Sequence, residues 1–136
     1  MAQFRSVTPR FAVSSQIGLG DIADAKALGF TMIINNRPDR ESPDQPMGAE
    51  IEIAAKNEGL DYAHIPVVGR PTAAQAQAVS RAVAGTSGKA LAFCRSGTRS
   101  ITSWALGELG TGARSRDELL SLAGAAGYDL SGVLPR

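Results

Sequence analysis

The stretch Lys89-Ala-Leu-Ala-Phe-Cys-Arg-Ser-Gly-Thr-Arg-Ser100 decides how this chain is interpreted. It begins with a short apolar run, which predicts a buried strand, and it continues into a polar loop that contains Gly97. Apolar residues then recur at helical spacing after Arg99 and Ser100, so the stretch predicts a strand, a tight loop and a helix. Cys94 is the one cysteine in 136 residues, and it falls at the junction of the predicted strand and loop.

The loop after Cys94 has the composition of an oxyanion site. Backbone N–H groups converge at the start of a helix, and the helix dipole is positive there, so the position suits both a thiolate and a bound anion. We expect Arg99 to bind two oxygens of such an anion through its guanidinium fork, and Ser100 to hydrogen-bond the sulfur. The other residues expected to bind substrate are Arg95, Ser96, Gly97 and Thr98. The competing interpretation is that Cys94 is a small buried hydrophobic residue, as free cysteines most often are.

The composition predicts a single domain that spans residues 1–136. Apolar residues make up 43% of the chain and charged residues 20%, which is ordinary for a soluble globular protein. The net charge of +1 gives no indication of a nucleic-acid or anionic-membrane partner, and the sequence does not identify a protein partner. One cysteine excludes an internal disulfide, no apolar run approaches the roughly 20 residues of a membrane span, and the first residues lack a signal-peptide core. We therefore expect a cytoplasmic protein.

Predicted strands and helices alternate along the chain. Two short β-prone pieces at 4–8 and 11–14 predict a hairpin. The further predicted strands are 31–35, 62–67 and 89–93, and the predicted helices are 21–28, 47–58, 72–84, 100–110 and 115–126. This alternation predicts an α/β fold with a parallel or mainly parallel sheet and helices on both faces.

Three polar loops should meet at one edge of this sheet, because ligands of such sheets bind beyond the carboxyl ends of the strands. The loops are 36–46, 68–71 and 94–100. The first of them contains Arg37, a candidate for binding substrate, and Asp39, a candidate general acid. The alternative for these two residues is an ion pair with each other.

Three pieces of the sequence carry a resemblance to a known family: Ile34-Asn-Asn-Arg-Pro-Asp39, Tyr62-Ala-His-Ile-Pro-Val67 and Cys94 to Ser100. They resemble the bacterial phosphatase-like domain of the beta-lactamase-hydrolase-like family, which is similar to the tyrosine phosphatases. The resemblance covers roughly residues 10–110. It implies a phosphatase-like three-layer α/β fold with a mainly parallel sheet of four or five strands. It also implies covalent catalysis at Cys94 and oxyanion binding by Arg99 with the loop amides.

The sequence departs from the tyrosine-phosphatase pattern in two ways. Only four residues separate Cys94 from Arg99, whereas the phosphatase signature has five, and the shorter loop is similar to that of a rhodanese. The loop 68–71 holds no carboxylate where these phosphatases usually carry their general acid. Two reactions therefore stay open for a small anionic substrate: hydrolysis of a phosphate ester, or sulfur transfer through a Cys94 persulfide. A third possibility is an inactive module that binds an oxyanion or a partner.

His64 is the sole histidine of the chain. We expect a structural, hydrogen-bonded role for it rather than a catalytic one. One cysteine and one histidine cannot build a closed zinc site, so we predict neither a metal site nor a cofactor.

Overall fold

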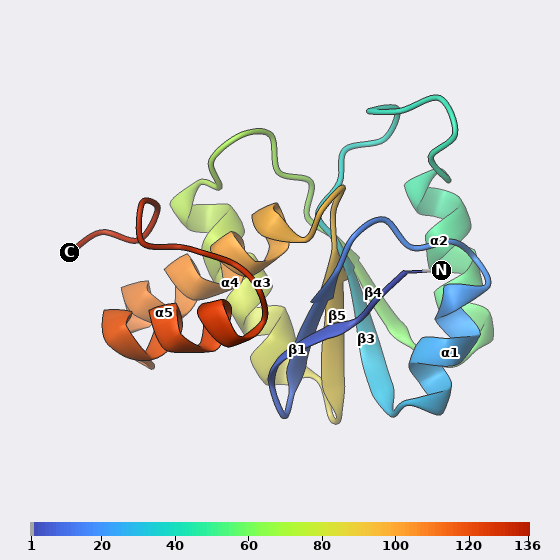
Figure 1. The fold of residues 1–136 in the computed structure, drawn as a ribbon. Coiled ribbons are helices and arrows are strands. Elements are labelled where there is room, and N and C mark those ends of the chain that lie inside the picture. The colour runs from blue at the N-terminus through green and yellow to red at the C-terminus, as the bar shows by residue number, and fades with distance from the viewer. Residues whose placement is uncertain (1) are drawn as a thin grey trace.

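Five strands form one mixed sheet in the order β1-β2-β5-β3-β4 (Figure 1). The computed structural model describes residues 2–136. The strands are β1 (Arg5–Thr8), β2 (Phe11–Ser14), β3 (Phe30–Asn35), β4 (Asp61–His64) and β5 (Lys89–Phe93). β1 pairs antiparallel with β2 at one edge, and every other neighbouring pair is parallel. The predicted hairpin and the mainly parallel sheet are therefore confirmed.

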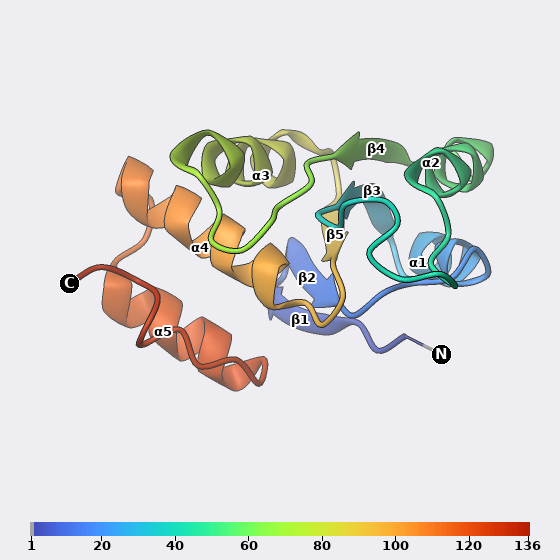
Figure 2. The ribbon, with the colours of Figure 1, turned by 90° about the horizontal axis from the view of Figure 1, so that it is seen from above.

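Helices cover both faces of the sheet, which confirms the predicted three-layer α/β architecture (Figure 2). One face carries α1 (Asp21–Ala27) and α2 (Gly48–Asn57), and the other carries α3 (Ala73–Gly85), α4 (Thr98–Thr111) and α5 (Arg116–Ala125). Among residues 2–136, no helix combines the length and the hydropathy that a bilayer span requires.

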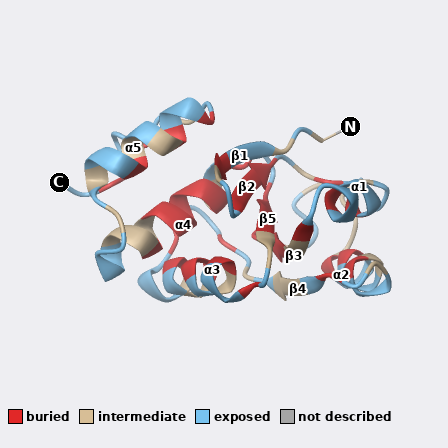
Figure 3. Ribbon diagram, turned by 90° about the horizontal axis from the view of Figure 1, so that it is seen from below, coloured by how far each residue is buried: buried red, intermediate tan, exposed pale blue. Residues whose placement is uncertain are grey.

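The central strand β5 separates two apolar cores. Ala90 and Ala92 face the layer of α3, α4 and α5, whereas Leu91 and Phe93 face the layer of α1 and α2. All four side chains are at most 1% exposed, so the strand is buried on both faces, as Figure 3 shows. Since β5 is held on both sides by parallel strands, the residue that follows it, Cys94, starts from a rigid position.

Small residues let α4 pack directly against α3. A Cβ atom placed on Gly107 of α4 would lie 2.5 Å from the carbonyl oxygen of Ala76 in α3. About one turn earlier in α4, Trp104 is 2% exposed and stacks on Phe11 with 4.9 Å between ring centroids. These contacts fix the axis of α4, and with it the position of the helix start that carries Arg99.

The predicted strand 62–67 is shorter in the structure and ends at His64. Pro66 has no N–H group and cannot continue a regular strand ladder. Ile65 and Val67 still donate backbone hydrogen bonds to the carbonyls of Asn35 and Asn36, at 2.8 and 3.0 Å. The segment therefore stays attached to the end of β3 and brings the carbonyl of Val67 to the edge where the polar loops meet.

Candidate active site

The cysteine loop is the tight connection from β5 to α4 at the carboxyl edge of the sheet, at the top of Figure 1. Cys94 directly follows β5 and is fully buried. Only residues 95–97 separate it from α4, which begins at Thr98, two residues before the predicted start at residue 100. Gly97 has a φ of 92°, a left-handed conformation that suits glycine, and its N–H donates a hydrogen bond to the Cys94 sulfur at 3.0 Å. A backbone amide thus contacts the sulfur, as an anion-binding loop requires.

Arg99 lies in the first turn of α4 and is held by two protein groups. Its Nη1 donates to Glu41 Oε2 at 2.8 Å and to the carbonyl of Val67 at 2.7 Å, and its Nη2 donates to Glu41 Oε1 at 2.8 Å. A guanidinium has five N–H donors, so these contacts leave the Nε–H and one Nη2–H without an oxygen partner among residues 2–136, and the guanidinium lies close to the Cys94 sulfur. Those two donors form the second fork of the guanidinium, which has the geometry for bidentate binding of an oxyanion.

Glu41 is a site residue that the sequence analysis missed. Its Oε1 also accepts a hydrogen bond from Arg37 Nε at 3.0 Å, so one carboxylate joins two guanidinium groups. The hydrogen bonds from Arg99 lower the pKa of Glu41 to about 2; partial burial opposes this effect, and the hydrogen bond from Arg37 adds to it. In return, the hydrogen bond with Glu41 raises the pKa of Arg99, burial lowers it, and interaction with the nearby Cys94 side chain raises it again. The sequence signal for this ion pair was the spacing of four residues from Arg37 to Glu41.

The predicted alternative of an ion pair between Arg37 and Asp39 is wrong. Arg37 is 4% exposed and binds Glu41 and the side-chain oxygen of Gln16, the latter at 2.9 Å. The Oδ1 of Asp39 instead accepts a hydrogen bond from the backbone N–H of Gly48, at the start of α2, at 2.7 Å. Glu41 takes the guanidinium because Asp39 is engaged by the helix start. The predicted substrate-binding role of Arg37 and the acid role of Asp39 stay predictions.

The remaining predicted loop residues divide by exposure. Arg95, Ser96 and Thr98 are exposed, and the hydroxyls of Ser96 and Thr98 lie 3.1 Å apart. Ser100 is fully buried, and its Oγ has no hydrogen-bond partner among residues 2–136. The expected hydrogen bond from Ser100 to the Cys94 sulfur is therefore not formed in the structure, where the Gly97 N–H contacts the sulfur instead.

Tyr128, in the segment after α5, holds the other side of the cysteine loop. Its hydroxyl donates to the carbonyl of Ser96 at 2.9 Å and packs against Gly97 so closely that a Cβ there would collide with it. Burial raises the pKa of Tyr128, the positive charge of Arg5 lowers it, and proximity to Cys94 raises it. Nothing in the sequence pattern indicated this contact, because Tyr128 lies 31 positions after Gly97 in the sequence.

His64 has the structural role that the sequence indicated. Its Nε2 lies 3.0 Å from the carbonyl oxygen of Arg37, so the ring supports the loop that carries Arg37 and Glu41. Within residues 2–136, no group of three or more His, Cys, Asp or Glu side chains is arranged to hold a metal ion.

Comparison with known proteins identifies the family of this chain. Residues 3–111 match the family described as "Beta-lactamase hydrolase-like protein, phosphatase-like domain". A beta-lactamase hydrolase-like protein from Xylella fastidiosa is 40% identical over 125 residues, and one from Agrobacterium fabrum is 36% identical over 126 residues. Each alignment covers 91% of this chain but only 29% of the relative, so the chain spans less than a third of the length of the curated relatives it matches.

Solved structures share the fold over nearly the whole chain. A candidate phosphatase from Neisseria meningitidis has a TM-score of 0.81 at 28% identity, with 94% of this chain and 91% of that chain covered. TpbA from P. aeruginosa, solved in complex with pTyr, has a TM-score of 0.66 at 15% identity, with 95% and 81% covered. The fold is therefore that of the cysteine-based tyrosine phosphatases, and the chain belongs to the phosphatase-like domain family of the beta-lactamase hydrolase-like proteins.

Proposed function

We propose that this chain is a cysteine-dependent phosphatase-type hydrolase that acts on small phosphate monoesters. The observation that carries the proposal is the N–H fork of Arg99 that no protein oxygen occupies, held close to the Cys94 sulfur at the start of the helix that follows it. A fixed fork beside a thiolate suits the three equatorial oxygens of a transferring phosphoryl group. Because solvent does not reach the Cys94 sulfur, the charge that develops there is stabilised by fixed protein groups instead of water.

The proposed reaction has two steps. The Cys94 thiolate attacks phosphorus, an S–P bond forms, and the P–O bond to the leaving group breaks while that oxygen takes up a proton. A water molecule then attacks the phosphocysteine, the S–P bond breaks, and inorganic phosphate and the thiolate are released. Arg99 binds two non-bridging oxygens in both steps, and the hydroxyl of Ser100 is available to stabilise the departing sulfur. The loop amides and the exposed side chains of the loop bind the rest of the phosphate.

Asp39 is the proposed proton donor for the leaving group. Glu41 is unsuited to this role, since a pKa of about 2 keeps it ionised at neutral pH. The Gly48 N–H binds one oxygen of Asp39, and its other oxygen stays available to carry a proton. Arg37 binds the same Oε1 of Glu41 that Arg99 binds, and we assign it to positioning this loop against the substrate.

Sulfur transfer is the second candidate, and the spacing of Cys94 and Arg99 favours it. A loop of four intervening residues offers a smaller cradle than the phosphatase loop, and a thiosulfate donor leaves as a stable anion without a strong general acid. In that reaction the Cys94 thiolate attacks the outer sulfur of thiosulfate, sulfite leaves, and the persulfide passes its sulfur to a nucleophile. Either chemistry needs Cys94 reduced, and Cys94 is a free thiol, so we propose a cytoplasmic location.

The deciding experiment measures hydrolysis of aryl phosphates and transfer of sulfur from thiosulfate to cyanide in parallel, with Cys94→Ser as the control. We expect phosphate release that disappears in Cys94→Ser, together with trapping of a phosphocysteine by rapid acid quench. Asp39→Asn should slow phenyl phosphate, with its poor leaving group, about 100-fold, and p-nitrophenyl phosphate much less. Thiocyanate formation without phosphate release would replace the hydrolase proposal by sulfur transfer. If neither activity is detected, the protein is an inactive module that binds an oxyanion or a partner.

A further inference from the structure

A polar pocket of about 340 Å³ adjoins the cysteine loop on the side away from Glu41. The strand order gives the two sides: Glu41 follows β3, whereas this pocket is lined by Arg5 of β1 and by Ser15, which directly follows β2. Since β5 lies between β2 and β3, the cysteine loop has Glu41 on one side and the pocket on the other. We call this space the Arg5 pocket.

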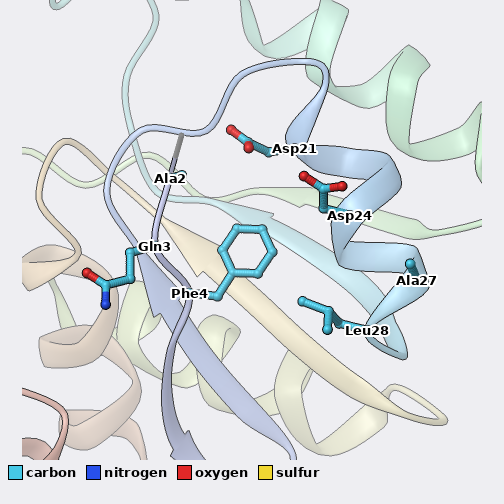
Figure 4. Close-up of a pocket in the computed structure, with 7 residues that line it drawn as sticks. All are labelled: Ala2, Gln3, Phe4, Asp21, Asp24, Ala27 and Leu28. Atoms are coloured by element: carbon cyan, nitrogen blue, oxygen red, sulfur yellow. The ribbon is translucent and has the colours of Figure 1, made fainter.

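The Arg5 pocket has the composition of an anion site. Its lining residues include one arginine, Arg5, four residues with hydroxyl groups, Ser15, Ser96, Thr98 and Tyr128, and no carboxylate residue. A second pocket, of about 550 Å³ between the N-terminal segment and α1, is different in kind. As Figure 4 shows, two acidic side chains of α1, those of Asp21 and Asp24, stand at that pocket above Phe4 and Leu28. An anion is repelled there and attracted in the Arg5 pocket.

Arg5 has donors left for a ligand. Its Nη1 donates to the carbonyl of Ala126 at 3.2 Å, and its guanidinium lies 5.9 Å from the centre of the Tyr128 ring. Among residues 2–136 it forms no salt bridge, since the ion pairs there involve other arginines. One of its five N–H groups is used by a protein oxygen, so four remain.

The Arg5 pocket is close to the proposed reaction centre. Ser96 lines the pocket and is two residues from Cys94 in the sequence. Two residues of extended chain span at most about 7 Å, so the pocket begins within that distance of the reacting cysteine along the backbone. Ser96 and Thr98 belong both to the cysteine loop and to the pocket lining, so the pocket is the space into which a second group of an ester bound at this loop can extend.

We propose that the Arg5 pocket binds a second anionic group of the substrate, a carboxylate or a phosphate, on the same molecule as the ester that is cleaved. This inference rests on the proposed function and adds the substrate class: small molecules that carry two anionic groups about one ring apart. Arg5 supplies the charge, and the loop hydroxyls supply further hydrogen bonds to the oxygens of that group.

The test compares two esters, 4-carboxyphenyl phosphate and 4-carbamoylphenyl phosphate, which have nearly the same shape and differ in charge at the far end. The measured quantity is the ratio of their kcat/KM values in each variant, so differences in leaving group cancel between variants. We expect Arg5→Gln to lower this ratio about tenfold, the value of one charge-assisted hydrogen bond. Turnover of the carbamoyl ester should stay unchanged, and Arg5→Lys should keep most of the wild-type ratio.

Arg70→Gln is the matched control, because Arg70 also donates one hydrogen bond from Nη1 to a backbone carbonyl, that of Val133, at 3.2 Å. It loses the same charge outside the pocket and should leave the ratio at the wild-type value. An Arg5→Gln ratio equal to that of wild type would overturn the proposal. So would stimulation of carbamoyl-ester turnover by free benzoate that is lost in Arg5→Gln, because the pocket would then take a separate anion.

A binding measurement separates this proposal from the proposed reaction. Calorimetric titration of Cys94→Ser with the two esters needs no turnover. Tighter binding of the carboxyl ester, lost in Arg5→Gln, would support the Arg5 pocket even if the wild-type protein hydrolysed neither compound. Equal affinities for the two esters would overturn the pocket even if hydrolysis at Cys94 were established.

Discussion

The two sides of the cysteine loop are held in different ways. On one side the carboxylate of Glu41 binds Arg99 and Arg37 through ion pairs of 2.8 and 3.0 Å. On the other side the neutral hydroxyl of Tyr128 donates one hydrogen bond to the Ser96 carbonyl and packs on Gly97. The charged side determines where the Arg99 fork points, whereas the neutral side determines the path of the backbone. A variant on each side should therefore change a different property of the site.

The largest effect is expected where both sides meet, at Gly97. Its φ of 92° is unfavourable for alanine by roughly 1–2 kcal/mol, and an added Cβ would collide with the Tyr128 hydroxyl. Relief of that collision displaces either the loop or the Tyr128 hydroxyl that holds the Ser96 carbonyl, and both changes disturb the loop whose amide contacts the Cys94 sulfur. We expect Gly97→Ala to lower kcat/KM for an aryl phosphate by about 100-fold or more, since misplacement by about 1 Å is enough for such a loss.

The double variant Gly97→Ala/Tyr128→Phe tests this explanation. Removal of the hydroxyl eliminates the nearest atom but leaves the backbone conformation unfavourable, so part of the activity should return. Gly112→Ala is the matched control, because Gly112 also has a positive φ, of 76°, at the other end of α4 and has open space around it. A Gly97→Ala protein with wild-type kcat/KM would show that the Tyr128 side does not set the loop geometry.

A smaller effect is expected on the charged side, from Glu41→Gln. Glutamine keeps the size of the side chain but loses the charge and one of the two acceptor oxygens that hold the Arg99 fork. We expect kcat/KM to fall about tenfold, equivalent to about 1.4 kcal/mol of transition-state stabilisation, with most of the change in kcat. Steady-state kinetics with p-nitrophenyl phosphate measures this change.

Two further variants make the Glu41 prediction specific. Glu52→Gln, which removes an exposed carboxylate on α2, should leave kcat/KM unchanged. In an Arg99→Ala background Glu41→Gln should add little, because Glu41 is proposed to act through Arg99. Full additivity of the two substitutions would contradict a positioning role for Glu41.

The two sides also differ in how far the sequence could predict them. The strand, loop and helix around Cys94 follow from local patterns, namely an apolar run, a glycine and helical spacing, and they are found close to the predicted positions. The sequence could not show that Arg37 pairs with Glu41 and not with Asp39, since both carboxylates lie in one loop without a regular pattern. Asp39 lies nearer the start of α2, whose N–H groups bind it, and Glu41 is left for the guanidinium groups.

The Tyr128 side was out of reach of sequence patterns for a different reason. Helical or strand periodicity reports on contacts within an element, whereas Tyr128 meets the cysteine loop through the packing of α5 against β1 and α4. The hydroxyl is positioned by a chain that returns to the sheet edge after the last helix. Residue 128 also lies beyond the 3–111 segment that matches the family, so the family pattern carries no information on it.

The smallest expected effect is on stability: the contributions of the charged side and the neutral side to the free energy of unfolding should depend differently on pH. The folded-state pKa of Glu41 is lowered from 4.5 to about 2, so its contribution to stability is complete above 4.5 and is lost as the pH falls toward 2. The pKa of Tyr128 is raised above 10.0, mainly by burial, so its contribution is complete below 10.0 and is lost only at higher pH. The Glu41 and Arg99 side chains are 29% and 19% exposed, so solvent screening limits the Glu41 contribution to about 1 kcal/mol.

Urea unfolding of wild type, Glu41→Gln and Tyr128→Phe at several pH values measures these contributions. The difference between wild type and Glu41→Gln should be about 1 kcal/mol at neutral pH and should disappear in acid. The difference for Tyr128→Phe, about 1 kcal/mol for one hydrogen bond, should be the same at neutral and acid pH. Added salt should reduce the first difference and leave the second unchanged, because only the Glu41 side depends on charge. If both differences followed the same pH curve, the two sides would be held by one coupled network, and the distinction drawn between them would fail.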